Sequence, residues 1–256
     1  MEELKIIRTN ENNIHEFGIC AYKDMKQPGY KNKVEWLKKR FKEGLRYNVL
    51  YHEKDGVVGN IEYVPGEYAW RPVDARGYFY IHCLIIFPKK YKGIGWGRKL
   101  LDDCIEDARK SGANGVAVTT RKRGWMVGKE LFVRNGFTVT DKAEPDYELM
   151  TLKLSDAPDP VFKKDLEKMR HKYSDGMYIF SSDQCPYTWK AIRDIGSVAR
   201  SVYGIKPEVI QLNDHIEARY SPTVYGTFCI VYKGEVLADH VISATRFKNI
   251  MNKLSK

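Results

Sequence analysis

The sequence predicts an α/β (α+β) protein in which a larger domain is followed by a smaller one. The chain has 256 residues, whereas a usual single domain has about 100–150. Short β-runs alternate with helical stretches along the whole chain, which is the pattern of a mixed α/β architecture. Residues 155–160 (SDAPDP) combine two prolines with two aspartates and a serine, as linkers do. We therefore expect a domain over 1–155, a linker and connecting helix over 156–175, and a second domain over 176–256.

The elements of the first domain follow from hydrophobic spacing and turn residues. Apolar side chains between Val34 and Leu45 recur at i, i+3, i+7 and i+11, which places them on one face of a helix. Asp55-Gly56 stands between two β-runs and predicts a tight hairpin. The expected order is a strand at 3–10, a helix around 34–45, strands at 46–53, 56–64 and 78–87, a helix with an apolar face from Leu100 to Ala108 that ends near Gly112, a strand at 115–120, a short helix around 126–134, and a final strand at 146–154.

The second domain is expected to alternate in the same way after a charged connecting helix at 162–173. The expected order is a strand at 177–182, a helix at about 187–203, strands at 207–212, 227–232 and 235–242, and a helix at about 245–254.

Composition narrows the class of protein. No stretch approaches the roughly 18 apolar residues that span a bilayer, and the acidic start MEELKIIRTN does not look like a secretory signal. We therefore expect a cytoplasmic protein with no membrane partner. The five cysteines contain no C-x-x-C pair and the six histidines are scattered, so no structural metal is expected. The net charge of +10 suits nucleic acid, another anion or an ordinary solvated surface, and by itself favours none of them.

The most informative segment is IIFPKKYKGIGWGRKLL at 85–101, where glycines occupy alternate positions before a helix. Such glycines let the backbone turn tightly and expose successive N–H groups, which together with the helix dipole can hold phosphate oxygens. Lys92 and Arg98 would add positive charge. Neither G-x-G-x-x-G nor G-x-x-x-x-G-K-[ST] occurs here. A loop that needs its glycines for shape alone is the alternative interpretation.

A family resemblance rests on two parts of this region. Lys92–Gly97 (KGIGWG) resembles the pyrophosphate signature [Q/R]-x-x-G-x-[G/A] of GNAT N-acetyltransferases, with lysine where glutamine or arginine is usual. KELFVRNGF at 129–137 resembles the closing segment of that family, and the order of elements over roughly 3–154 is similar too. The resemblance implies the GNAT fold, a mixed sheet with flanking helices. It also implies an enzyme that moves an acetyl group from acetyl-CoA to the primary amine of a small molecule or peptide.

The resemblance further implies where acetyl-CoA binds. In this family the cosubstrate lies where the strand before the turn splays from its neighbour, with its pyrophosphate on the turn and its pantetheine arm on the strand backbone. The spacing from Pro88 to Lys92 is one residue longer than is common, which leaves open whether Ile86 or Phe87 holds the pantetheine position. The expected acetyl-CoA site comprises Ile85, Ile86, Phe87, Lys92, Gly93, Ile94, Gly95, Trp96, Gly97 and Arg98.

Acetyl transfer needs a neutral amine, and an amine with a pKa near 10.4 costs about 4–5 kcal/mol to deprotonate at pH 7. Glu62 and His82 lie near the expected cleft and are the candidate bases. Their plainer interpretations are a solvated strand end for Glu62 and a hydrogen-bonded core residue for His82. The tyrosine that many relatives use as the acid is Phe132 here, and the asparagine seven residues before it is Trp125.

Two further segments are candidates for shaping the acceptor pocket. They are the aromatic loop Glu67–Pro72 and the run RKRGW at 121–125, whose basic and aromatic side chains would suit an aromatic or acidic acceptor. Surface packing and solvated charge are the alternative interpretation.

The second domain carries Cys185-Pro186-Tyr187-Thr188, which resembles the C-P-Y-C centre of glutaredoxins with threonine in place of the second cysteine. Its order of elements resembles a thioredoxin-like fold, although Thr227 stands where that fold usually has a proline. It also resembles the YoaP-like domain attached to some GNAT proteins. We expect this domain to cover the acceptor site or to mediate a homodimer; a monothiol redox role for Cys185 is the alternative.

Three functions are thus open from the sequence. The first is an acetyltransferase whose partners are acetyl-CoA and an amine acceptor, with no nucleic acid. The second is a catalytically degenerate module that binds acyl-CoA, which Phe132 and Trp125 motivate. The third is a redox protein that acts through Cys185.

Overall fold

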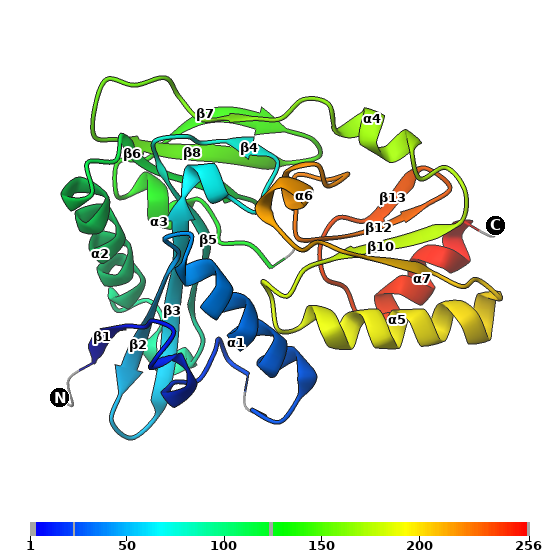
Figure 1. Ribbon diagram of the computed structural model, residues 1–256, viewed down its shortest axis with the longest axis horizontal. Coiled ribbons are helices and arrows are strands. Elements are labelled where there is room, and N and C mark those ends of the chain that lie inside the picture. Colours follow the sequence, from blue (N-terminus) through cyan, green and yellow to red (C-terminus); the bar gives the residue numbers. More distant parts are fainter. Residues whose placement is uncertain (1–3, 23, 123–124, 255–256) are drawn as a thin grey trace. The chain divides into compact units, whose positions relative to one another are not determined.

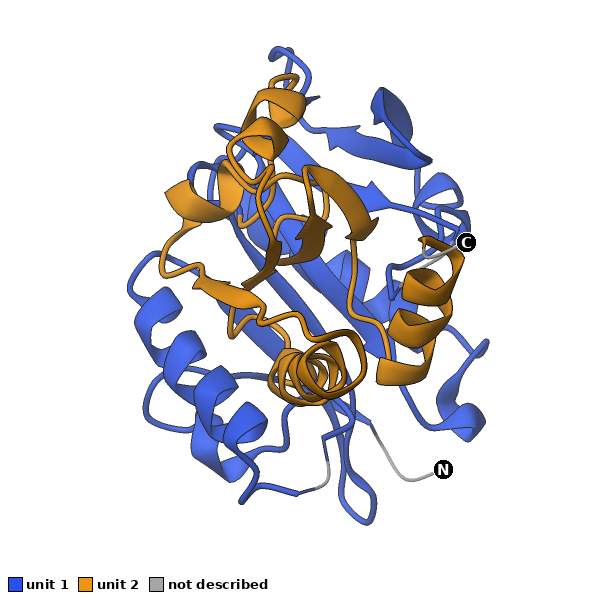
Figure 2. Cartoon of the chain, turned by 90° about the vertical axis from the view of Figure 1, so that its right-hand side faces the viewer, with its two compact units in different colours: residues 1–69, 73–162 blue, residues 70–72, 163–256 orange. Residues whose placement is uncertain are grey.

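The computed structural model describes residues 4–22, 24–122 and 125–254. The chain divides into two compact units, one made of Met1–Ala69 with Val73–Phe162 and the other of Trp70–Pro72 with Lys163–Lys256 (Figure 2). Among the described residues, no helix has the length and apolar character that crossing a membrane requires. The described part of the chain also contains no group of three or more histidine, cysteine or acidic side chains placed to hold a metal ion.

The first unit is built on a seven-stranded mixed sheet (Figure 1). Its strand order is β1-β2-β3-β5-β6-β8-β7, and every neighbouring pair is antiparallel except β5 with β6. The strands are β1 (Lys5–Arg8), β2 (Arg46–His52), β3 (Gly56–Pro65), β5 (Phe79–Ile86), β6 (Gly115–Thr120), β7 (Thr138–Ala143) and β8 (Tyr147–Lys153). A separate two-stranded ladder joins β4 (Val73–Asp74) to β9 (Val161–Phe162).

Helices flank this sheet. The helices of the first unit are α1 (Pro28–Phe41), α2 (Trp96–Lys110) and α3 (Glu130–Val133), with short 3-10 turns η1 (Ile14–Glu16), η2 (Gly66–Tyr68) and η3 (Lys89–Tyr91). Proline at the first position of α1 suits a helix start, because its missing N–H would have no intrahelical partner. The mixed sheet with flanking helices confirms the predicted GNAT fold class.

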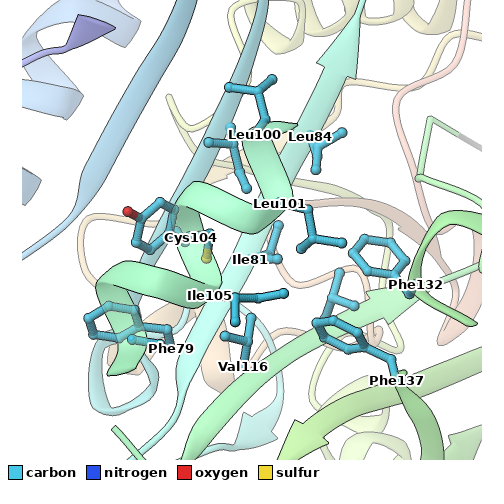
Figure 3. Close-up of a cluster of buried hydrophobic side chains, with 14 of the residues drawn as sticks. Phe79, Ile81, Leu84, Leu100, Leu101, Cys104, Ile105, Val116, Phe132 and Phe137 are labelled. Atoms are coloured by element: carbon cyan, nitrogen blue, oxygen red, sulfur yellow. The ribbon is translucent and has the colours of Figure 1, made fainter. Parts of the chain in front are cut away.

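The main core lies between α2 and the sheet (Figure 3). Leu100, Leu101, Cys104 and Ile105 point from α2 toward sheet residues such as Ile81, as the apolar face predicted from the sequence requires. Side chains alternate between the faces of a strand. Because Ile61 and Tyr63 of β3 belong to this core, the residue between them, Glu62, points to the opposite face.

The sequence analysis missed β7, and the ends that it gave for several helices differ from the observed ones. The segment Thr138–Ala143 (TVTDKA) is mostly polar and half-exposed, so it has no apolar period, yet it pairs with β8 as an edge strand of the sheet. The expected helix around 126–134 is reduced to one turn, Glu130–Val133, and α1 begins six residues earlier than the expected residue 34.

The second unit contains a four-stranded sheet of order β11-β10-β12-β13, in which β10 and β11 are parallel and the other pairs antiparallel. The strands are β10 (Met177–Ser181), β11 (Glu208–Gln211), β12 (Phe228–Tyr232) and β13 (Glu235–Ala238), and the helices are α4 (Leu166–His171), α5 (Thr188–Tyr203), α6 (His215–Arg219) and α7 (Ala244–Leu254). The short helix α6 was not expected; the Asp214 side chain caps it by accepting from the Glu217 amide at 2.8 Å.

The segment Trp70–Pro72 is an integral part of the second unit, although it lies far from the rest of that unit in sequence. The Arg71 guanidinium donates to the carbonyl of Tyr225 and lies 4.6 Å from the centre of the Tyr225 ring. Gly226 has a φ of +75°, and a Cβ there would stand 2.6 Å from the carbonyl oxygen of Trp70. The second unit therefore closes tightly around this three-residue insertion.

Candidate active site

The glycine-rich turn connects β5 to α2. Gly93 and Gly95 have φ values of +78° and +97°, a region that costs other residues about 1–2 kcal/mol. Gly95 is the N-cap of α2, so the helix begins at Trp96 and its first amides have no intrahelical acceptor. The turn therefore presents backbone donors at the positive end of a 15-residue helix. Those are the conditions for binding an anion.

A cavity of about 460 Å³ opens on this turn. It is lined by Lys92, Gly93, Gly95, Gly97 and Arg98, together with Ile86 at the end of β5. The structure thus brings together six of the ten residues of the expected acetyl-CoA site, while Ile94 stands 64% exposed on the turn. The cavity also includes Tyr91, Leu131, Arg134 and Asn135.

Sequence reasoning had not assigned these last four residues. Arg134 and Asn135 follow α3 and lie in the segment 129–137, which the sequence analysis had already singled out. Membership of that segment was the signal that could have identified them. Arg134 adds a third cation beside Lys92 and Arg98. The Asn135 side chain donates to the carbonyl of Leu131 at 2.7 Å.

The strand before the turn loses its neighbour at a definite point. β5 pairs with β6 from Phe79↔Val116 to Ile81↔Val118, and within the described residues β6 does not pair with β5 beyond that. On the other side, β5 continues against β3 as far as Phe87, whose amide donates to Val58 at 3.1 Å. Because backbone groups alternate in direction along an antiparallel pair, Phe87 faces β3 and Ile86 faces the splayed side.

His82 is the first residue of β5 beyond the paired part. The register between β3 and β5 shifts at this point, from Tyr63↔Ile81 to Glu62↔Cys83, so His82 is the extra residue of a β-bulge. Bulges re-aim side chains and are common next to active sites. The splay of two parallel strands and the bulge therefore coincide at one residue.

The two candidate bases lie together and are buried. His82 Nδ1 is 3.3 Å from Glu62 Oε1, and both side chains are 1% exposed. The interpretation of Glu62 as a solvated group at a strand end is therefore wrong. Lys33 of α1 donates from Nζ to Glu62 Oε2, and its side chain is fully buried. We call Lys33, Glu62 and His82 the buried triad.

Aromatic rings surround the ammonium end of the triad. Lys33 Nζ lies 4.2 Å from the centre of the Trp36 ring and 5.7 Å from that of Tyr47. Burial raises the pKa of the Tyr47 hydroxyl well above its ordinary value, and this hydroxyl accepts from the Cys20 amide at 2.9 Å. Such rings stabilise a desolvated cation through their negative faces.

The charge state of Glu62 follows from these contacts. Burial by itself raises the pKa of the Glu62 carboxyl, but Lys33 and His82 together outweigh burial and lower it from 4.5 to about 2. Glu62 is therefore ionised at any pH near neutrality.

Sequence reasoning missed Lys33, although a signal for it exists. It stands four residues before Leu37 and three before Trp36, both buried, so it occupies the apolar stripe of α1. A lysine on a buried stripe needs a buried partner, and a search for one along the neighbouring strands would have led to Glu62.

The segments expected to shape an acceptor pocket are only partly described. Arg121 pairs with Asp146, lies 4.5 Å from the Tyr147 ring and lines a cavity of about 510 Å³ with Lys129 and Glu148, whereas 123–124 lie outside the described residues. Glu67–Ala69 belong to the first unit and Trp70–Pro72 to the second.

Three other positions singled out from the sequence are buried or half-buried. Phe132 is fully buried with its ring centre 5.3 Å from that of Phe137, so this side chain offers no acid. Cys185 is half-buried ahead of α5, and its carbonyl accepts from the Thr188 hydroxyl at 2.8 Å. Thr227 is buried, and its carbonyl accepts from the Ser182 amide at 3.0 Å.

Known proteins are similar to this chain in sequence. A family model described as YoaP-like matches residues 208–249. An uncharacterized N-acetyltransferase, YoaP of Bacillus subtilis (strain 168), is 32% identical over 254 residues, which cover 97% of this chain and 99% of the relative.

Solved structures are similar to part of the chain. One is a putative acetyltransferase, YncA of Salmonella typhimurium, with acetyl-CoA (23% identity, TM-score 0.44, covering 61% of this chain and 98% of that one). Another is the PaiA N-acetyltransferase of Thermoplasma acidophilum in complex with coenzyme A (15% identity, TM-score 0.42, covering 59% and 99%).

Proposed function

We propose, because the chain belongs to the YoaP-like family of GNAT N-acetyltransferases, that it moves an acetyl group from acetyl-CoA to the primary amine of a small molecule or peptide. The enzyme is an acyltransferase. The observation that carries the proposal is the coincidence of three features: β5 leaves β6 at Ile81, the cavity opens on the turn that follows, and the buried triad reaches the same splay at His82.

The residues present fit a polyanionic cosubstrate. The amides from Gly93 to Arg98 would hold the diphosphate at the start of α2. Lys92, Arg98 and Arg134 would balance its charge. Since the Phe87 amide is already used by Val58, we assign the pantetheine position to the backbone of Ile86 rather than to that of Phe87.

Glu62 and His82 would serve the acceptor amine, which must lose a proton before it can attack the thioester. Their position at the splay supports this role, because there the strand backbone is open on one side and the triad lies on the other. Phe132 is core, so the thiolate would leave without a side-chain acid from that position.

The domain assignment is likewise a proposal. We assign 1–155 to the acetyltransferase domain, 156–175 to the linker and connecting helix, and 176–256 to a thioredoxin-like (YoaP-like) domain. The strand order β11-β10-β12-β13 and the YoaP-like match over 208–249 support the last of these. A cytoplasmic location and a homodimer stay predictions from the sequence.

The test is release of free coenzyme A thiol from acetyl-CoA in the presence of a panel of amines. We expect thiol release that depends on both protein and amine, with formation of the matching acetamide. Tight binding of coenzyme A with no turnover on any amine would instead make the protein an acyl-CoA-binding module. Heat-denatured protein is the control for spontaneous acetylation.

A further inference from the structure

The buried triad divides the chemistry among three residues from three separate elements, α1, β3 and β5. We infer that His82 takes the proton from the acceptor ammonium, that Glu62 orients the His82 ring, and that Lys33 is a positioning residue that acts on His82 through Glu62. This inference rests on the proposed acetyltransferase function and assigns a role to Lys33.

Glu62 is poorly placed to be the base itself. One carboxylate oxygen accepts from Lys33 and the other faces His82 Nδ1 at 3.3 Å, so both oxygens are engaged inside the protein. The pKa of this carboxyl is also low, so its affinity for a proton is too small for an effective base.

His82 is the member of the triad that lies on the bulge where β5 leaves β6. Because Nδ1 lies 3.3 Å from the ionised Glu62 carboxylate, we assign the ring proton to Nδ1, and the neutral ring then carries its lone pair on Nε2. The Tyr80 ring packs edge-on at 5.7 Å and limits rotation of the imidazole. A base fixed by a carboxylate in this manner is positioned for proton transfer, and its imidazolium form is stabilised once it forms.

Lys33 completes the charge balance of the triad. With Lys33 positive, Glu62 negative and His82 neutral, the buried group carries no net charge, which is the least costly state away from water. Without the ammonium, Glu62 would favour the imidazolium form of His82. The described titratable groups that contact the triad include Tyr47 of β2 and Tyr80 of β5, both buried. Lys33 therefore keeps His82 neutral and able to accept a proton.

The proton balance is as follows for a primary ammonium acceptor. One proton passes from nitrogen to His82 Nε2, and the free amine forms a C–N bond to the thioester carbonyl carbon. The C–S bond then breaks, and the second nitrogen proton goes to the departing thiolate, which gives an amide and free thiol. His82 returns its proton to solvent, so no further reactant is consumed.

The experiment compares the pH dependence of kcat/KM in the wild-type protein, Lys33→Met, His82→Gln and a matched control, Lys38→Met, with one amine from the panel. Lys38 lies on the same helix and pairs with Glu35 at 3.0 Å, but its side chain is 38% exposed. We expect His82→Gln to lose about 100-fold or more in kcat/KM, the usual range for a general base. In Lys33→Met, the acidic limb of the kcat/KM profile should move to higher pH by about one unit. The value of kcat/KM should fall about tenfold at pH 7 and recover near pH 9.

The outcomes separate the possible failures. The acidic limb of the kcat/KM profile could lie at the same pH in Lys33→Met as in the wild type and Lys38→Met. That result would overturn the role assigned to Lys33, and a lower melting temperature alone would make it a structural residue. An unimpaired His82→Gln variant would overturn the role of His82. Absence of turnover in the wild type would overturn the proposed function and this inference together.

A second measurement covers the case in which Lys33→Met does not fold. Nitrogen-15 NMR of the wild-type imidazoles, with His82 assigned from the His82→Gln spectrum, should show a neutral ring protonated at Nδ1 at pH 7. A ring protonated at Nε2, or an imidazolium that persists through pH 8, would contradict the inference.

Discussion

The glycine-rich turn and the buried triad are the two halves of the proposed site, and they are built in opposite ways. The turn is a contiguous stretch, Lys92–Arg98, that acts through backbone groups and stands open to solvent. The triad is assembled from side chains of α1, β3 and β5 and is closed to solvent. Binding of a large anion needs access and many donors, whereas control of one proton needs burial and fixed partners.

This difference predicts that the two halves respond differently to substitution. Changes in the turn should mainly alter coenzyme A affinity, because most of its side chains are exposed, although Trp96 packs partly against the core. Changes in the triad should alter turnover and stability and leave affinity for coenzyme A nearly intact. The following predictions run from the largest expected effect to the smallest.

Glu62→Ala should lower the free energy of unfolding by about 3–5 kcal/mol, because it leaves the Lys33 ammonium buried without its counter-ion. Urea denaturation followed by tryptophan fluorescence would measure this. The double variant Lys33→Met with Glu62→Gln removes both charges and should recover most of the loss. A Glu62→Ala variant as stable as the wild type would contradict the buried ion pair.

The stability contributed by Glu62 should depend on pH with a definite sign. Because its pKa is lowered from 4.5 to about 2 on folding, the contribution is present above about pH 4.5 and is lost as the pH falls toward 2. Its full size is on the order of 3 kcal/mol. The measurement is the difference in free energy of unfolding between the wild type and the double variant. As the pH falls, the wild type should lose stability relative to the double variant. A difference that does not depend on pH would argue against an ionised Glu62.

Gly97→Ala should weaken coenzyme A binding about tenfold, roughly 1.4 kcal/mol. A Cβ at this position would meet Leu84 and Leu131 at 3.8 Å, which are ordinary contacts, so the fold accepts it. It would nevertheless occupy space beside the helix amides that the diphosphate needs. Stability should stay the same or rise by up to about 1 kcal/mol, since alanine is favoured over glycine in a helix.

The matched control for this variant is Gly95→Ala. There the obstacle is conformational, because φ is +97° and no heavy atom lies within 4 Å of the added Cβ. Gly95→Ala should therefore lose about 1–2 kcal/mol of stability. Unchanged affinity in Gly97→Ala would show that the diphosphate does not approach this end of α2.

Cys185→Ser should change the rate of thiol release by less than about twofold, the smallest effect of the set. The residue is half-buried in the second unit, and the proposed transfer step uses no protein thiol. Cys229 is a poor substitute as a reactive thiol, because burial raises its pKa to about 12. If Cys185→Ser lowered the rate of thiol release tenfold or more, the second unit would have to take part in the reaction.

The two halves of the site also differed in how far the sequence revealed them. The turn was predictable because its glycines, its cations and the start of α2 are adjacent in the chain, and such a pattern has a direct physical meaning. Glu62 and His82 were predictable only as separate candidates. Their contact depends on the register between β3 and β5, including a bulge that no local pattern marks. Lys33 was missed because its partner lies in another element.

The same reasoning explains the misses in the fold. The strand Thr138–Ala143 is an edge strand with polar side chains, and its pairing with β8 decides its structure more than its own composition does. The helix His215–Arg219 is too short to show an apolar period and depends on its cap at Asp214. By contrast, α2 was predicted with its buried face because apolar residues recur on that face from Leu100 to Ala108.

The central claim is that the turn at Lys92–Arg98 binds acetyl-CoA beside the splay of β5 and β6. Isothermal titration of the intact protein with acetyl-CoA tests it most directly. The account predicts heat of association at one site per chain, about tenfold weaker in Gly97→Ala and unchanged in His82→Gln. A folded wild-type protein that gives no heat with acetyl-CoA or coenzyme A would contradict it.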